Sequence, residues 1–203
     1  MNAAYVAHAL WTALRIARFD KEAVKDFDQS FEGFFRSFFG IVLCAPLYVI
    51  YLAAARSIAE EVREISPEQI PPEGPVLYAL ETLGYLAQWI AFPLVMILVT
   101  RLLGAGHRYV PYIVAYNWTS SVALAFNTLP YVLYLAGVLP ALAAIYLHSL
   151  VLLYVLVYHW LVAREGLQIS GFNASGIVMI DVIVSYFLAY LVAELHPALA
   201  PAA

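Results

Sequence analysis

The stretch that decides the fold covers residues 109–163 and reads YVPYIVAYNWTSSVALAFNTLPYVLYLAGVLPALAAIYLHSLVLLYVLVYHWLVA. It contains no Asp, Glu, Lys or Arg. As one helix it would be about 80 Å long, because an α-helix rises about 1.5 Å per residue. A bilayer core is only about 30 Å thick. The stretch therefore predicts two membrane spans joined by a tight turn, which Gly137 and Pro140 mark because both residues interrupt helices.

The composition of the whole chain is that of a membrane protein. Of its 203 residues, 64% are hydrophobic and 12% are charged, whereas soluble domains carry about 25% charged residues. A soluble domain of this size has too much surface to bury so many apolar side chains. The net charge is −4, and the 10 Lys and Arg residues are dispersed. Nucleic acid is therefore excluded as an expected partner, since its binding needs a basic patch.

Further apolar runs of membrane length lie on both sides of this stretch. We predict an all-α membrane helix bundle of about five transmembrane helices, over residues 37–55, 76–103, 109–138, 141–163 and 172–193. The bundle as a whole covers residues 35–196, between a cytoplasmic or interfacial segment over 1–34 and a C-terminal tail over 197–203. Pro46 and Pro93 are expected to kink the first two spans.

The basic residues predict the orientation, because they collect on the cytoplasmic side of a membrane. With five spans, one side receives only Arg56 and Arg63, and the other receives Arg15, Arg18, Lys21, Lys25, Arg36, Arg101, Arg108 and Arg164. This partition predicts a cytoplasmic N-terminus and an external C-terminus in the inner membrane of a bacterium. Residues 1–16 lack the basic start and long apolar run of a cleavable signal peptide, so we expect the N-terminus to be retained.

Two patterns before the first span predict contact with the membrane surface. Residues 3–18 form an amphipathic helical pattern, which favours an interfacial helix, through Tyr5, Val6, Ala9, Leu10 and Leu14. An aromatic stripe at helical spacing follows, formed by Phe31, Phe34, Phe35, Phe38 and Phe39. We interpret this stripe as a membrane anchor in preference to a ligand-binding surface.

The candidate functional residues are the polar side chains at membrane depth, namely Asp181, Asn117, Asn127, His148, His159 and Ser185. An ionisable group at this depth is energetically expensive and is a functional candidate by default. Asp181 and Asn117 each lie about 12 Å into their spans, so we expect them to meet. His148 and His159 share one helix face on either side of Asp181 in depth, an arrangement suited to a proton relay. The simpler interpretation, which we favour, is interhelical hydrogen bonding.

Motifs for other chemistry are lacking. The single cysteine, Cys44, lies in an apolar run and is expected to be a buried apolar residue. The segment 57–75 is expected to be the main external loop, and its first half is compatible with an outward extension of the first helix. It contains five glutamates, for which a solvated face is favoured over a metal site. The sequence therefore predicts no catalytic residue, no cofactor and no metal. An intramembrane enzyme would want two carboxylates or a nucleophile with a base, so we do not expect an enzyme.

The polar N-terminal segment, the five closely spaced spans, the external C-terminus and the aromatic FEGFFRSFF at residues 31–39 resemble the Yip-type family of five-span membrane proteins. Compact prokaryotic membrane-protein families of unassigned role have the same plan. The resemblance implies the five-span fold. In eukaryotes that family is linked to membrane traffic and small GTPases. No diagnostic motif matches, so no functional residue is carried over.

Two functions follow from these expectations. The first is a non-enzymatic membrane scaffold or partner-binding protein, in contact with the lipid bilayer and with a membrane-protein partner or a second copy. The alternative is a small transporter or channel that handles protons or a solute around Asp181.

Overall fold

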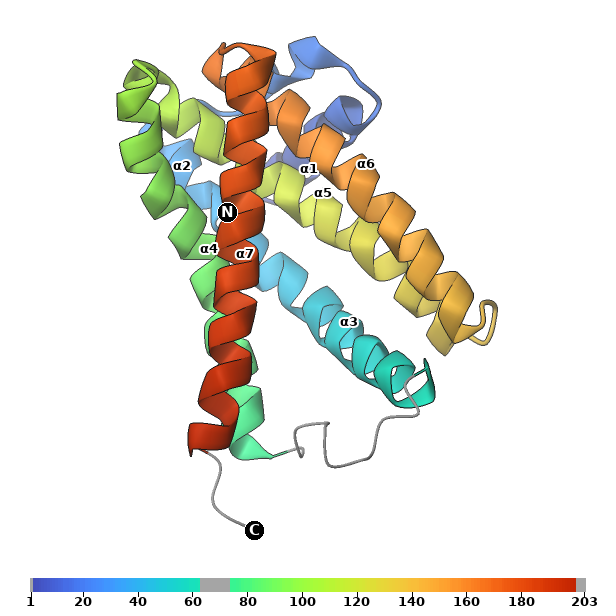
Figure 1. The fold of residues 1–203 in the computed structure, drawn as a ribbon. Helices are drawn as coiled ribbons and strands as arrows, with labels where there is room; N and C mark the ends of the chain where they lie inside the picture. Colours follow the sequence, from blue (N-terminus) through green and yellow to red (C-terminus); the bar gives the residue numbers. More distant parts are fainter. Residues whose placement is uncertain (1, 63–73, 200–203) are drawn as a thin grey trace.

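The computed structural model describes residues 2–62 and 74–199 (Figure 1). Within them every regular element is a helix, in the order α1 (Ala3–Ala17), η1 (Lys21–Asp26), α2 (Phe31–Ser37), α3 (Gly40–Val62), α4 (Pro75–Leu102), η3 (Gly106–Arg108), α5 (Tyr109–Leu135), α6 (Ala141–Leu167) and α7 (Gly171–Leu199). The predicted all-α class is therefore confirmed for the described residues.

Four helical segments are long and apolar enough to cross a membrane, namely Phe31–Val62, Pro75–Leu102, Ala141–Leu167 and Gly171–Leu195. They correspond to the first, second, fourth and fifth predicted spans. The first predicted span ended at residue 55, whereas α3 continues to Val62, so that the first part of the segment 57–75 extends the helix; residues 63–73 lie outside the described residues. The third predicted span, α5, is not among these four segments. It has 27 residues, as α6 has, but its polar side chains lower its mean hydropathy.

Helix α5 occupies the centre of the fold. It packs most extensively against α6 and α3, and α1 and α2 also contact it. Its fully buried side chains include Tyr112, Ile113, Val114 and Trp118. In Figure 1, α4 and α7 run side by side, while α3, α5 and α6 lean away from them. The long helix that is not among the four apolar segments is thus the one with the most buried side chains, and α3, α4 and α6 all contact it.

The two ends of the bundle differ in charge. The N-terminal elements, the α4–α5 connection and the α6–α7 connection lie at one end, and the α5–α6 turn and the C-terminal end of α7 lie at the other (Figure 1). The first end carries the eight basic residues that the predicted partition grouped together. At the other end, Gly137 has a φ of 70°, a left-handed conformation that glycine adopts readily. The predicted turn between the third and fourth spans is therefore present.

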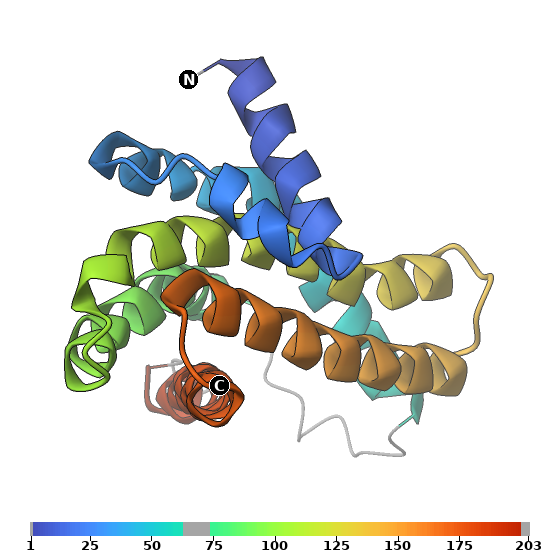
Figure 2. The ribbon, with the colours of Figure 1, turned by 90° about the horizontal axis from the view of Figure 1, so that it is seen from above.

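The amphipathic face of α1 packs on the protein. Ala9, Ala13 and Ile16 are buried, and the Tyr158 hydroxyl donates a hydrogen bond of 2.7 Å to the Ala13 carbonyl. The apolar residues that we expected to contact lipid, among them Leu10 and Leu14, pack against this core instead. Small alanines let α1 approach its neighbours closely, so burial against protein replaces burial in lipid. Figure 2 shows α1 lengthwise while α7 is seen end-on.

The aromatic stripe divides between two directions. Phe34 and Phe38 pack against the protein core, and the Phe34 ring lies 6.1 Å from that of Tyr109. Phe31 and Phe35 point outward, with 68% and 62% of their surface exposed. A stripe that was interpreted only as an anchor therefore also attaches α2 to the bundle, because α2 lies alongside α5.

Prolines lie inside the helices where the sequence placed them. Pro46 is within α3 and Pro93 within α4. The Pro93 carbonyl accepts a hydrogen bond of 3.0 Å from the Tyr109 hydroxyl. This contact ties α4 to the start of α5 at a position where proline interrupts the regular hydrogen bonding.

Candidate functional site

Three helices bring a tyrosine, a histidine and an aspartate together in the bundle. The Tyr116 hydroxyl of α5 donates a 2.7 Å hydrogen bond to Oδ1 of Asp181 on α7. The second carboxylate oxygen, Oδ2, lies 3.2 Å from Nδ1 of His159 on α6. Each carboxylate oxygen therefore has a partner from a different helix. We call Tyr116, His159 and Asp181 the polar cluster.

The polar cluster is largely shielded. The side chains of His159 and Asp181 are 13% and 14% exposed. Aromatic rings line it, since Phe92 lies 4.3 Å from the Tyr116 ring between centroids, and the Tyr116 and His159 rings are 5.3 Å apart. Apolar surroundings strengthen hydrogen bonds and make an unpaired polar group costly. The second ring nitrogen of His159, Nε2, is buried and has no hydrogen-bond partner within the described residues.

The structure corrects the expected meeting of Asp181 with Asn117. The Asn117 side chain is fully buried and its Nδ2 donates a 2.9 Å hydrogen bond to Oγ of Ser37 at the end of α2. One residue along a helix turns the side chain by about 100°, so Tyr116 faces α7 and Asn117 faces α2. Sequence reasoning missed Tyr116, because it followed a polar stripe at helical spacing from Asn117 to Tyr131, and Tyr116 lies one position off that stripe. The only available signal was a tyrosine at the same depth as Asp181.

The remaining candidates do not join the polar cluster. His148 lies toward the other end of α6, where its Nδ1 is 3.3 Å from the Asn127 carbonyl and its ring is 4.9 Å from that of Tyr131. The amide oxygen of Asn127 is buried without a hydrogen-bond partner among the described residues. Ser185 lies about one turn beyond Asp181 on α7 and is half-buried. The predicted chain through both histidines is therefore not formed, and Asp181 pairs with His159.

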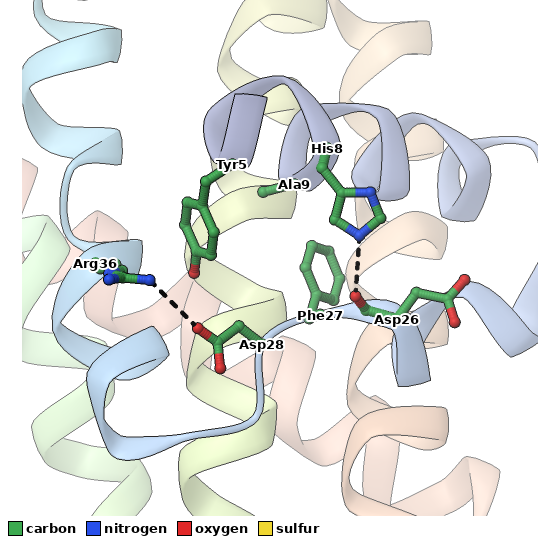
Figure 3. Close-up of a pocket in the computed structure, with 7 residues that line it drawn as sticks. All are labelled: Tyr5, His8, Ala9, Asp26, Phe27, Asp28 and Arg36. Atoms are coloured by element: carbon green, nitrogen blue, oxygen red, sulfur yellow. Dashed lines mark hydrogen bonds and ion pairs between the residues drawn. The ribbon is translucent and has the colours of Figure 1, made fainter. Parts of the chain in front are cut away.

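The elements α1, η1 and α2 form what we call the N-terminal layer. A pocket of about 320 Å³ lies in this layer (Figure 3). Tyr5, His8 and Ala9 come from α1, and Arg36 comes from α2, with Asp26, Phe27 and Asp28 between them. The Arg36 guanidinium lies 5.2 Å from the centre of the Tyr5 ring and 4.0 Å from the Asp28 carboxylate. His8 Nε2 is 3.3 Å from the Asp26 carbonyl. The pocket is therefore lined by charged and aromatic groups from several segments.

Local partners favour the ionised form of two acids near this pocket, Asp20 and Asp28. A hydrogen bond from the Ser30 hydroxyl lowers the pKa of Asp28, and hydrogen bonds from Arg15 lower the pKa of Asp20. Arg15 also reaches Asp26 at 2.5 Å. Burial raises the pKa of the Tyr5 hydroxyl above its ordinary value. The layer is a network of paired charges on the surface of the bundle.

The described part of the chain gives little support for a metal site or for a reactive cysteine. There, no three His, Cys, Asp or Glu side chains come together as metal ligands do. Cys44 is buried, with its sulfur 3.9 Å from the Ser121 carbonyl, as an apolar residue would be. No family model matches the chain, and neither a curated protein nor a solved structure is significantly similar to it.

Proposed function

We propose that this chain is an integral membrane protein that crosses the bilayer five times and acts as a non-enzymatic scaffold or partner-binding protein. The observation that carries the proposal is that polar side chains deep in the bundle bond from one helix to another. Asp181 joins α7 to α5 and α6, Asn117 joins α5 to α2, and the Tyr85 hydroxyl joins α4 to the Ile41 carbonyl of α3 at 2.6 Å. Hydrogen bonds of this kind hold membrane helices in one arrangement.

A bundle held in this way presents fixed surfaces to partners. The N-terminal layer is one such surface, because it combines paired charges with outward aromatic side chains, of which Trp11 and Phe19 are more than half exposed. We infer that this layer lies at the cytoplasmic face, in agreement with the excess of basic residues at this end. A membrane-protein partner or a second copy is the proposed occupant. The topology-level resemblance to the Yip-type family remains a prediction.

The span that this proposal adds to the four apolar segments is α5, the third in chain order. Its length of 27 residues corresponds to about 40 Å of helix, enough to cross a bilayer. Its polar stripe does not oppose this placement, since polar residues of membrane helices face the interior of the bundle. The buried stripe includes Asn117, Ser121 and Thr128.

Cysteine labelling in intact cells tests the crossing of α5. In a Cys44→Ala background, we expect Val138→Cys in the α5–α6 turn to react with a membrane-impermeant maleimide from outside. Gly106→Cys before α5 should react only after permeabilisation, because α5 separates the two positions. Glu22→Cys in η1 is the control for the side of Gly106. Labelling of 106 and 138 from the same side would refute a transmembrane α5.

A transporter or channel is the second candidate, and the buried His159 Nε2 favours it. A histidine that touches a carboxylate through Nδ1 and leaves Nε2 without a partner could pass a proton onward. However, neither the N-terminal pocket nor the cavity lined by α3 and α4 is lined by Asp181. We therefore place this candidate second.

Proton flux separates the two functions. The protein is reconstituted into vesicles that contain a pH-sensitive dye, and a potassium diffusion potential drives proton entry. For a scaffold, we expect wild type and Asp181→Asn to give the same flux as protein-free vesicles. A wild-type flux that Asp181→Asn abolishes would overturn the scaffold proposal and establish proton handling at the polar cluster. Ser185→Ala serves as a matched control one turn away on α7.

A further inference from the structure

The basic side chains at the end of the bundle that holds the N-terminal layer differ in whether they have a partner. Those that lie within 4.0 Å of a carboxylate are Arg15 with Asp20 and Asp26, Lys25 with Glu22, Arg36 with Glu32 and Asp28, and Arg164 with Glu165. Arg18 lies 5.4 Å from the centre of the Trp11 ring. Within residues 2–62 and 74–199, no carboxylate pairs with Lys21, Arg101 or Arg108. Both unpaired arginines belong to one connection between helices.

Arg101 and Arg108 lie on the two sides of the α4–α5 connection. Arg101 is in the last turn of α4, and Arg108 is the last residue of η3. The Cγ atom of Arg101 lies 3.8 Å from the position that a Cβ atom would take at Gly106, so this side chain packs against the connection. The chain has no Asp or Glu between Glu81 and Glu165. The connection therefore carries positive charge and contributes no acidic residue to balance it.

The backbone of the connection leaves both guanidinium groups available for a ligand. Basic side chains near the end of a helix often bind its last carbonyl groups. Here the backbone N–H groups of residues 103–105 donate to the carbonyls of residues 99–101 at 2.8–3.1 Å, so the end of α4 is already capped. Helix α5 begins at Tyr109 without a side-chain cap, and the positive end of its dipole faces the same connection. The connection is therefore suited to an anion supplied from outside the chain.

Helix α4 presents an exposed apolar stripe beside this connection. Leu94, Leu98 and Leu102 are 59%, 61% and 76% exposed, and because they lie four residues apart they form one line about 12 Å long. Leu98 and Arg101 are three residues apart and are therefore neighbours on the helix surface. Half of the hydrocarbon core is about 15 Å thick. This part of α4 lies at the same end as the N-terminal layer (Figure 1). In the proposed crossing, the stripe therefore lies in the cytoplasmic leaflet, with the arginines at its surface.

We propose that the α4–α5 connection binds an anionic phospholipid of the cytoplasmic leaflet. Arg101 and Arg108 hold the phosphate, since guanidinium groups bind phosphate oxygens through paired hydrogen bonds, and one acyl chain lies along the leucine stripe of α4. Basic residues at the cytoplasmic ends of membrane helices attract anionic lipids. A zwitterionic headgroup would bring an ammonium group to the same two cations, and like charges at short range repel. The proposal rests on the proposed membrane crossing, but not on the scaffold role.

Lipid retention measured by native mass spectrometry tests the proposal. The full-length protein is released from nanodiscs that contain equal amounts of phosphatidylglycerol and phosphatidylethanolamine with identical acyl chains. We expect retained phosphatidylglycerol to be at least about fivefold more abundant than retained phosphatidylethanolamine. Glycerol 3-phosphate, equimolar with the lipid, should not displace it, because this headgroup lacks the acyl chain that contacts the leucines. Equal retention of the two lipids, or displacement by glycerol 3-phosphate, would overturn the proposal.

Two double variants with the same change in net charge locate the bound lipid. Arg101→Gln with Arg108→Gln is expected to reduce the preference for phosphatidylglycerol to about onefold, in a protein that elutes as wild type from size-exclusion chromatography. Arg18→Gln with Lys21→Gln removes two exposed cations at the same end of the bundle and should leave the preference unchanged.

The comparison separates a site from the general positive charge of this end. An equal loss of preference in the two double variants would show that no site exists at the α4–α5 connection and would overturn the proposal, as would an unchanged preference in the first. The cysteine-labelling pattern reports membrane crossing independently, so a failure of lipid binding is distinguishable from a failure of the five-span topology.

Discussion

Gly40→Val is expected to destabilise the protein by about 2–3 kcal/mol, as overpacking of a tight core does. Gly40 begins α3 at the point where this helix meets α4 and α5. A Cβ atom at this position would lie 2.6 Å from Cη2 of Trp89 and 2.7 Å from Oγ of Ser121. Trp89 is itself buried, so the indole has little room to move. The measurement is the equilibrium free energy of unfolding in mixed detergent micelles, followed by tryptophan fluorescence.

The matched control for this variant is Gly176→Val on α7. No atom outside the local backbone lies within 4 Å of a Cβ at Gly176, so the same substitution meets open space there. We expect its free energy of unfolding to stay within about 0.5 kcal/mol of wild type, as for surface substitutions. Equal losses for the two variants would contradict the close approach of α3, α4 and α5 at Gly40.

Asp181→Ala is expected to destabilise the protein by about 1–3 kcal/mol. Removing the carboxylate leaves the Tyr116 hydroxyl and His159 Nδ1 without the acceptor that they share. A buried polar group that loses its partner costs about 1–3 kcal/mol, although interhelical hydrogen bonds in membranes contribute about 0.6–2 kcal/mol. The loss appears in the same micelle titration, and it should be accompanied by a weaker association of α7 with α5 and α6.

Asp181→Asn and Tyr116→Phe separate the contributions within the polar cluster. Asparagine keeps an oxygen for Tyr116 and an amide for His159, so its loss should be less than half of that for alanine. In a double-mutant cycle, Tyr116→Phe should have little further effect once Asp181 is alanine, because the bond is already gone. Additive losses for Tyr116→Phe and Asp181→Ala would show that the two side chains do not interact.

Much of the helical framework could be predicted from the sequence, because helix ends depend on nearby residues. The predicted span 141–163 corresponds to α6 (Ala141–Leu167), and 76–103 corresponds to α4 (Pro75–Leu102). The first span was predicted too short, because Arg56 was treated as its outer limit. That arginine lies within α3 near Glu81 of α4, and such a partner from another helix is not visible in a single hydropathy profile.

The candidate site was predictable only in part. Asp181 and His159 were both identified, because ionisable groups in apolar helices are conspicuous. Helical rise gave the depth of Asp181 between His148 and His159 to within about one turn, but the expected partner of Asp181 was Asn117 and not His159. The choice of Tyr116 over Asn117, and the separation of His148 from the polar cluster, depend on the rotation of each helix about its axis.

By itself, the sequence determined the helical class, the order and approximate length of the apolar helices, and the collection of basic charge at one end. These properties depend on the lengths of the apolar stretches and on the helix-breaking residues between them, which act locally along the chain. Tertiary structure decided that α5 lies at the centre, that the apolar face of α1 packs on protein, and that Asp181 bonds Tyr116. The physical reason is that two helix faces pack according to the shape and rotation of both. A shift of one residue turns a side chain by about 100° toward a different neighbour.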